Sequence, residues 1–422
     1  MKLSKHKLGE LIEVTRGASL SGQFYAEEGE LVRLTLGNFN MNGGGFKENT
    51  SKTDLYYIGT VKDEFILNKG DIITPLTEQS LGLLGTTARI PESGKYIQSQ
   101  DVALVRCKEG LLDPNFCYYL ISSSVVRQQL SAGAQQTKIR HTSPDKIKDC
   151  TVWIPELEVQ KRIGHILSDI DEKIALNRQI NDNLEAMAKQ LYDYWFVQFD
   201  FPNEEGKPYK SSGGAMVWNE KLKREIPQGW GTQNLADCLK LKTERVNLKD
   251  IKDTDNYTPI EVIPRKQMSL HETVALENAM SGICRYSRRN ILLSNRRVYF
   301  HKVCIAPFDG LTRDTVLVLE PYNSGNLGYL YETVFADEFI LFATKHSYGS
   351  EQPVLSWTAV QKFNVLRPSN SIDKKYSKIV DSIIESVLNN QIEIIKLTKQ
   401  RDELLPLLMN GQASVNYHLS AY

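Results

Sequence analysis

The sequence lacks any long hydrophobic run. No stretch of eighteen or more apolar residues occurs in the 422 residues, so no membrane-spanning helix is predicted. The first residues are not followed by the apolar core of a secretory signal. A cytoplasmic location is therefore expected.

Cysteine is sparse and carries no recognisable spacing. The six cysteines are scattered without a Cys-x-x-Cys pair, at Cys107, Cys117, Cys150, Cys238, Cys284 and Cys304. This pattern supports neither a disulfide framework nor a zinc site, because both need paired or regularly spaced thiols. We expect buried thiols and no metal site.

Neither sign of charge is in excess. Lysine plus arginine and aspartate plus glutamate number 51 each, whereas a domain that binds nucleic acid by itself is usually basic. Contact with DNA would therefore come from local patches, or be shared with a partner that supplies positive charge.

The familiar catalytic motifs are also missing. The sequence has no Walker loop ending in Gly-Lys-Ser/Thr, no Gly-x-Ser-x-Gly turn and no His-Glu-x-x-His helix. A nucleotide-driven motor, a hydrolase of the serine type and a zinc protease are thus not indicated. The sequence predicts a chain that binds and does not catalyse, with no catalytic residues and no cofactor of its own.

What the sequence does contain is a long helical stripe in its middle. Counting by sevens from Ile163, the inward positions would be Ile163, Ile166, Ile170, Lys173, Asn177, Ile180, Leu184, Met187, Leu191 and Tyr194. Eight of these ten are apolar, which is the period at which one helix winds against another. The predicted helix would be roughly 50 Å long at ~1.5 Å per residue.

A second stripe near the other end offers a partner helix. Its inward positions would be Tyr376, Val380, Ile383, Val387, Asn390, Ile394, Leu397, Arg401, Leu404 and Leu408, and again eight of ten are apolar. Each stripe carries one central asparagine, Asn177 or Asn390, and a buried asparagine fixes the register of a coiled coil. The alternative is that each helix packs separately on a globular core.

The chain also repeats its own plan. Residues 235–239 resemble residues 8–12, a similar closing pattern ends at Pro155 and Pro368, and a long helix follows each closing pattern. We therefore predict a mixed α/β (α+β) fold with a pseudo-two-fold repeat, in which two similar globular domains are separated by two long antiparallel coiled-coil helices. The predicted segments are 1–155 (first domain), 156–200 (central helix), 201–229 (linker), 230–368 (second domain), 369–412 (distal helix) and 413–422 (tail). Within the domains, single helices are predicted at residues 116–129 and 335–344.

Basic and amide side chains suggest where DNA would be contacted. In the second domain the stretch 285–302 contains no acid, and its arginines could bind phosphate or read guanine. The candidates there are Arg285, Arg288, Arg289, Asn295, Arg296, Arg297, Tyr299, Lys302, Arg313, Lys345, Ser347, Tyr348 and Ser350. In the first domain they are Gln79, Ser80, Arg89, Gln98, Gln100, Gln135, Gln136, Thr137, Lys138, Arg140 and His141. The alternatives are a solvated strand edge for the basic stretch and plain surface connections for the loops.

Several short motifs together resemble one family. Residues 199–202 (FDFP), 206–214 (GKPYKSSGG), 216–220 (MVWNE) and 226–230 (IPQGW) are similar to the linker of type I restriction-modification specificity (S) subunits. Residues 400–411 (QRDELLPLLMNG) resemble the end of the second long helix in that family, and residues 305–310 (IAPFDG) resemble part of its recognition domains.

The resemblance implies a DNA-binding role without catalysis. It implies two target-recognition domains, each reading one half of a split, asymmetric site in double-stranded DNA. It also implies that the long helices dock two methyltransferase (M) subunits, and through them restriction (R) subunits. S-adenosylmethionine, ATP and Mg would then be bound by those partners, which methylate adenine or cut unmodified DNA.

Other functions stay open from the residues alone. A close variant is the specificity subunit of a related system that cuts on both sides of its site. A coiled-coil scaffold that joins proteins without touching DNA would also need two long helices. A free-standing transcriptional regulator is disfavoured by the balanced charge and by the lack of a clear helix-turn-helix.

Overall fold

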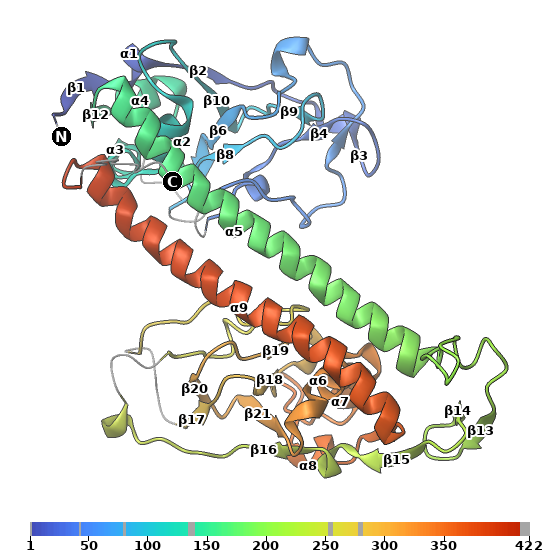
Figure 1. Cartoon of the computed structure of the whole chain (residues 1–422). Coiled ribbons are helices and arrows are strands. Elements are labelled where there is room, and N and C mark those ends of the chain that lie inside the picture. Colours follow the sequence, from blue (N-terminus) through green and yellow to red (C-terminus); the bar gives the residue numbers. More distant parts are fainter. Residues whose placement is uncertain are drawn as a thin grey trace. The chain divides into compact units, whose positions relative to one another are not determined.

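The computed structural model describes residues 2–41, 44–78, 82–133, 140–251, 256–276 and 282–413, except for the side chain of residue 248. The chain forms two compact units. Unit 1 comprises Met1–Glu172 and Leu397–Tyr422, and unit 2 comprises Lys173–Lys396. The two long helices, α5 (Leu157–Tyr192) and α9 (Asn370–Met409), are green and red in Figure 1, and each contributes residues to both units.

Unit 1 is built on an antiparallel four-stranded sheet. Its order is β2 (Ile12–Arg16), β10 (Val102–Cys107), β6 (Ile72–Pro75) and β8 (Ala88–Arg89). Two further pairs are β1 (Ser4–Lys7) with β12 (Thr151–Ile154) and β7 (Thr77–Glu78) with β11 (Arg140–His141). The central strands are buried, as the apolar run Val102–Val105 requires.

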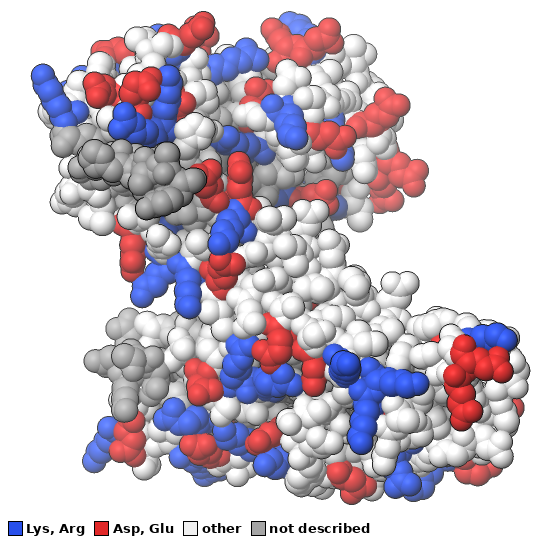
Figure 2. Space-filling view, in the orientation of Figure 1, with Lys and Arg blue, Asp and Glu red and all other residues white. Residues whose placement is uncertain are grey.

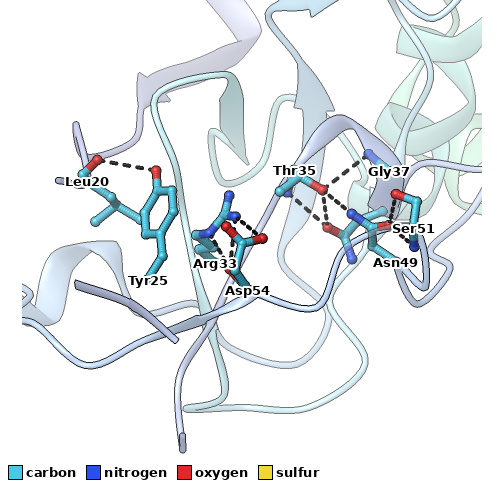
Figure 3. Close-up of polar contacts among 9 residues, drawn as sticks. Leu20, Tyr25, Arg33, Thr35, Gly37, Asn49, Ser51 and Asp54 are labelled. Atoms are coloured by element: carbon cyan, nitrogen blue, oxygen red, sulfur yellow. Dashed lines mark hydrogen bonds and ion pairs between the residues drawn. The ribbon is translucent and has the colours of Figure 1, made fainter. Parts of the chain in front are cut away.

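A second, smaller sheet belongs to an insertion in unit 1. It consists of two-residue strands in the order β3 (Tyr25–Ala26), β5 (Tyr56–Tyr57), β4 (Val32–Arg33) and β9 (Tyr96–Ile97). Such short strands need side-chain support, and Figure 3 shows it. Arg33 donates to the carbonyl of Asp54 at 2.9 Å and to its carboxylate at 3.2 Å, while its guanidinium lies 3.7 Å from the centre of the Tyr25 ring.

Short helices complete unit 1. They are α1 (Leu8–Leu11), α2 (Pro114–Ser122), α3 (Ser124–Gly133) and α4 (Pro144–Lys148), with 3-10 turns at Gly22–Phe24, Leu36–Asn38 and Asp63–Phe65. The single helix predicted for residues 116–129 was wrong. The backbone leaves the helical conformation and becomes extended at Ser123 (φ −66°, ψ 154°). The Ser123 hydroxyl donates to the carbonyl of Leu120 at 2.6 Å. Serine competes in this way for backbone hydrogen bonds, which ends the helix.

Unit 2 repeats the same plan. Its four-stranded antiparallel sheet has the order β16 (Leu239–Leu241), β21 (Val316–Pro321), β18 (Ile291–Ser294) and β19 (Val303–Ile305). The additional pairs are β13 (Met216–Asn219) with β14 (Arg224–Pro227), β15 (Gly231–Asn234) with β22 (Asn364–Arg367), and β17 (Ile283–Tyr286) with β20 (Gly310–Arg313). The β15–β22 pair takes the place that β1–β12 holds in unit 1.

The helices of unit 2 follow the same order as in unit 1. They are α6 (Leu327–Phe335), α7 (Asp337–Lys345) and α8 (Trp357–Val360), with 3-10 turns at Leu235–Asp237, Leu248–Asp250, Val298–Phe300 and Ser324–Asn326. A helix was predicted only for residues 335–344. The structure has two helices that meet at the extended residue Ala336 (φ −61°, ψ 143°), so this part of unit 2 matches the broken pair α2–α3.

Aromatic side chains gather where α5 ends in unit 2. A π-turn at Asp193–Val197 widens the last turn and aims Phe196 at a buried group of rings. The Phe196 ring centre lies 4.7 Å from those of both Tyr329 and Tyr376, and Trp230 stacks on Phe201 at 4.9 Å. Clustered rings of this kind contribute beyond their buried area, so this cluster fastens the end of α5 to unit 2.

Each unit has its own hydrophobic core. In unit 1 the main core joins the sheet and α2 to Ile163 and Leu167 of α5. In unit 2 the main core joins the sheet and α6 to Tyr376, Val380 and Ile384 of α9. Over the described residues, no helix is both long and apolar enough to cross a lipid bilayer.

Candidate nucleic-acid interface

In unit 2, Asn295 brings together three segments predicted to contact DNA. Its side-chain amide donates to the carbonyl of Asp314 at 2.8 Å, and its backbone N–H donates to Thr315 at 3.0 Å. Its own carbonyl accepts the N–H of Leu355 at 2.8 Å. The chain at Arg313, the turn at Arg296 and the loop before Leu355 therefore meet at one buried asparagine.

The turn that follows Asn295 presents basic and aromatic side chains. The backbone of Arg296 bridges to Val354, and the N–H of Arg297 donates to the carbonyl of Pro353 at 3.0 Å. Arg297 and His301 both have left-handed backbone angles, with φ of 47° and 55°. Such conformations are unusual for residues other than glycine and can mark functional turns. The His301 ring is held by the Phe335 carbonyl at 2.7 Å.

Exposed side chains surround this turn. Tyr348 is 64% exposed and Tyr299 is 49% exposed, while Lys345 and Ser350 are also exposed and Ser347 is half-buried. We define the loop cluster as Arg296, Arg297, Tyr299, Tyr348 and Ser350. Arginine and hydroxyl groups can hold phosphates and read base edges, so the loop cluster has the chemistry of a DNA-contacting surface.

Other basic residues of the predicted set are engaged within the protein. Arg288 donates to Glu385 of α9 at 2.6 Å and to the carbonyl of Pro307 at 2.7 Å. Arg289 pairs with the same carboxylate and with Asp381 at 3.2 Å. The stretch 285–302 contains no acid, but α9 supplies acids from much later in the chain. DNA contact by these two arginines stays a prediction, and their observed contacts are structural.

Two more members of the set have internal contacts, and a third is half-buried. Arg285 lies 3.5 Å from Glu244. Lys302 donates to the carbonyls of Ile260 and Glu261 at 2.6 and 3.0 Å, and burial lowers the pKa of its ammonium group. Arg313 is half-buried, and its Nε atom has no hydrogen-bond partner among the described residues.

In unit 1 the matching position is held by an ion pair. One oxygen of the buried Glu78 carboxylate accepts the N–H groups of Gly82, Leu83 and Leu84 at 3.0–3.1 Å. The other oxygen lies 3.1 Å from Arg140, without the alignment of a hydrogen bond. Glu78 and Arg140 also pair through β7 and β11. The predicted residues Gln79, Ser80, Gln135, Gln136, Thr137 and Lys138 lie outside the described residues.

The remaining candidates of unit 1 differ in exposure. Gln98 is 1% exposed and donates to the carbonyls of Thr15 and Val102 at 2.9 and 3.0 Å, which makes it a strand-joining residue. Arg89 donates to Asn115 at 2.7 Å. Gln100 and His141 are exposed, and they are the two described candidates here whose side chains face solvent.

Figure 2 shows the charges on one face of the molecule. Lys and Arg are interspersed with Asp and Glu there, in keeping with the equal totals of 51. Among the described residues on the face drawn, basic side chains form no continuous surface.

The inward stripe of α9 is close to the one expected from the sequence. Val380, Ile383, Val387 and Ile394 are buried, whereas Asn390, Leu397 and Leu404 are half-buried. The stripe predicted for α5 was right at six of its ten positions. Ile163 and Asn177 are buried, and Ile166, Ile170, Leu184 and Leu191 are half-buried.

The other α5 positions need correction. Ile180, Met187 and Tyr194 are exposed, at 38%, 56% and 36%, and Lys173 is exposed as well. The buried residues lie one position later, at Leu167, Ile174, Asn181, Ala188 and Trp195. Asn181 and Ala188 are less apolar than Ile180 and Met187, so hydrophobicity alone favoured the wrong register.

Asparagines do join the two helices within unit 2, in a different pairing from the one expected. Asn390 donates to Asn181 at 2.9 Å, and Asn181 donates to the Val387 carbonyl at 3.3 Å. Asn177 donates instead to Glu393 at 2.9 Å. In unit 1, Arg401 lies 2.8 Å from Asp171. Within unit 2 these contacts join later residues of α5 to earlier residues of α9, as in an antiparallel pair.

Comparison with known proteins identifies the family. The family model described as a type I restriction modification DNA specificity domain matches residues 2–186. The MjaIX type I restriction enzyme specificity subunit of Methanocaldococcus jannaschii is 24% identical over 331 residues, which cover 73% of this chain and 71% of the relative. The HindI specificity subunit of Haemophilus influenzae is 23% identical over 380 residues, covering 75% and 81%. Over these ranges the chain is similar to type I restriction-modification specificity subunits.

A solved specificity subunit has the same fold. The type I restriction-modification S subunit from M. genitalium matches with a TM-score of 0.60 and 16% identity, over 97% of this chain and 96% of that one. In the described ranges of this chain, no group of three or more His, Cys, Asp or Glu side chains is placed to hold a metal ion. The absence of a metal and of a cofactor stays a prediction.

Proposed function

We propose that this chain is the DNA sequence-specificity subunit of a type I restriction-modification complex. The repeated plan carries the proposal. Two units with the same strand order and the same broken helix pair each contribute to a pair of long helices, and the family match covers the first of the two repeats. Two similar domains that carry different loops suit a target made of two different halves.

Within this proposal each unit reads one half of a bipartite, asymmetric target in double-stranded DNA. In unit 2 the loop cluster would make the contacts, because its arginines and tyrosines are presented on turns held by Asn295. In unit 1 the contacts would come from the segments that Glu78 and Arg140 hold together. Arg288 and Arg289 both contact α9, so in this proposal they position the domain on the helix.

The long helices would dock the partner subunits. Three exposed apolar residues of α5 (Leu176, Ile180 and Met187) and Tyr194 of the following π-turn are 36–56% exposed and lie at helical spacings of four and seven. A stripe of this kind on a helix suits another helix. We assign it to the two methyltransferase subunits, with restriction subunits joining through them. S-adenosylmethionine, ATP and Mg would be bound by those partners, and adenine would be the methylated base.

Family membership disfavours the scaffold alternative, because the matching domain is described by its DNA specificity. A subunit that selects chromosomal sites works where the DNA is, so the cytoplasmic location stays our expectation. The function proposed for this chain is DNA recognition, and the subunits of the matching family are non-catalytic.

Methylation mapping tests the proposal. Cells that contain the chain and its neighbouring methyltransferase are compared by long-read sequencing with cells that lack the chain alone. The expected result is a split adenine-methylation motif that disappears with the chain. Unchanged methylation, together with a methyltransferase that fails to bind the purified chain, would overturn the proposal.

A further inference from the structure

Unit 2 contains an unexplained polar cavity beside α5. Its volume is ≈ 320 Å³, and its walls come from α5 at Asp182–Lys189, from residues 266–268 and from α6. None of these residues belongs to the loop cluster. The cavity is notable for its buried acids, which the DNA-reading role does not use.

Glu332 is the first of these acids. Its side chain lines the cavity but is only 3% exposed, and no described residue is a hydrogen-bond donor to its carboxylate. Burial raises the pKa of Glu332 to about 8. A buried carboxyl group without a donor costs stability unless a partner arrives.

Glu185 of α5 lines the same cavity. It accepts one hydrogen bond, from the N–H of Met268 at 3.0 Å, and burial raises its pKa to about 7. Tyr331 adds a third polar group, since its ring is 1% exposed and its hydroxyl has no partner among the described residues. The carboxyl groups of Glu185 on α5 and Glu332 on α6 therefore line one cavity, and the Met268 N–H is the one hydrogen-bond donor that a described residue supplies to them.

The missing donor is an organic cation. Across the described residues no set of three potential ligands is arranged for a metal, and the walls at Ala186, Met268 and Phe335 suit an aliphatic stem. Two lysines also line the cavity, but Lys189 is paired with Asp193 and Lys266 is exposed. When both glutamates are ionised, they and Asp182 exceed the two lysines by one negative charge.

We propose that this cavity receives an arginine side chain from a methyltransferase subunit docked on α5, with Glu185 and Glu332 as its partners. The inference rests on the proposed function. Guanidinium offers five donors, is weakly hydrated and fits carboxylates on two walls better than ammonium does. The cavity wall at Ala186 adjoins the exposed Met187 of the docking stripe, so a helix on that stripe can reach it.

Binding would release protons. In the free chain the raised pKa values keep Glu332 largely protonated and Glu185 partly protonated near neutral pH. An arginine favours their ionised forms, and the displaced protons pass to water. Affinity for the methyltransferase should therefore rise as the pH increases from 6 to 9.

The test measures the affinity of the purified methyltransferase subunit for the full chain by calorimetry. Glu332→Gln and Glu185→Gln each remove a carboxyl group that would ionise on binding and keep the shape of the side chain. We expect each to weaken binding about 10- to 100-fold, the usual effect of losing a charge-assisted hydrogen bond. Glu338→Gln is the matched control, because Glu338 is an exposed acid on the neighbouring helix α7, and it should bind like the wild type.

The pH dependence of the wild-type affinity is a second measurement, and it needs no variant. The titratable groups that line the cavity are Asp182, Glu185, Lys189, Lys266, Tyr331 and Glu332, and the pKa values of Glu185 and Glu332 are raised to about 7 and about 8. A flat profile in the wild type, or unchanged affinity in both Gln variants, would overturn the cation site. The proposed function would still hold if the wild type binds the methyltransferase and supports methylation, whereas no binding at all would count against that function first.

Discussion

Units 1 and 2 share a scaffold but fix their recognition loops by different means. In unit 1 a short strand pair and the Glu78–Arg140 ion pair close the loop region. In unit 2 the equivalent place holds a single bridge between Arg296 and Val354, supported by Asn295. Buried strands are thus repeated while the loop anchors are not. This is what two domains that read unlike half-sites would need.

The units also differ in the contacts that hold the long helices against each globular core. In unit 1, Asp171 of α5 receives the Tyr119 hydroxyl at 2.6 Å and Arg401 at 2.8 Å. In unit 2 an aromatic cluster holds the end of α5, and Arg288 and Arg289 form ion pairs with Glu385 and Asp381 of α9. Packed rings contribute more than partly exposed ion pairs, so unit 2 should depend chiefly on its aromatic residues.

The largest effect should come from that cluster. Phe196→Ala removes a ring that is 1% exposed and should lower the free energy of unfolding by ~3–5 kcal/mol. Urea unfolding followed by tryptophan fluorescence measures this change. Tyr194→Ala, on an exposed ring two residues earlier, should change stability by less than about 1 kcal/mol. Equal losses of unfolding free energy in both variants would show that the aromatic cluster does not hold α5 to unit 2.

A buried acid should give unit 2 a pH-dependent stability. The pKa of Glu332 is raised above its unfolded value, so its contribution is full below about pH 4.5 and is lost as the pH rises through 8. Glu332→Gln should remove this slope and make the chain a few kcal/mol more stable than the wild type at pH 9. Urea midpoints at pH 5, 7 and 9 compare the two chains, and parallel curves would contradict the assignment.

Two glycines test how closely the helices approach in each unit. A Cβ at Gly164 of α5 would lie 2.8 Å from the backbone nitrogen of Phe116, and a Cβ at Gly328 of α6 would lie 2.5 Å from Val380 of α9. Alanine at either position should cost ~1–3 kcal/mol, because rigid neighbours must shift. Gly133→Ala, where a Cβ meets nothing within 4 Å, is the control. Thermal unfolding of the three variants would show whether both contacts are equally tight.

The smallest effect should come from the corrected stripe of α5. Ile180→Ser changes an exposed residue and should shift stability by less than about 0.5 kcal/mol, whereas Ile174→Ser, at 4% exposed, should cost more than ~2 kcal/mol. The same Ile180 variant should weaken binding of the methyltransferase, if the exposed stripe docks it. A large stability loss at Ile180 would restore the register first predicted from the sequence.

The sequence predicted the buried face of a helix correctly where the buried residues follow the spacing of the apolar residues. The stripe of α9 was predicted well because its apolar residues cover a broad face, including Ile384 and Leu388. On α5 two apolar stripes compete, and the sequence cannot say which one faces α9 and which faces solvent. The paired asparagine Asn181 was missed for that reason, although its spacing of four from Asn177 placed it on the same face.

The candidate interface was harder to predict than the fold. A run of arginines looks uniform in sequence, but Arg288 and Arg289 meet acids almost a hundred residues away, while Arg296 and Arg297 sit on a turn made by left-handed backbone angles. Contacts over such distances depend on the completed fold. The sequence motifs of the linker, in contrast, were enough to indicate the family.

The most direct test of the account is to map the methylation motif of a chain with an altered loop in unit 2 only. Arg296→Ala with Arg297→Ala, expressed with the methyltransferase, should relax or change one half of the split motif and leave the other half as in the wild type. If both halves change together, or if neither does, the assignment of one half-site to each unit is contradicted.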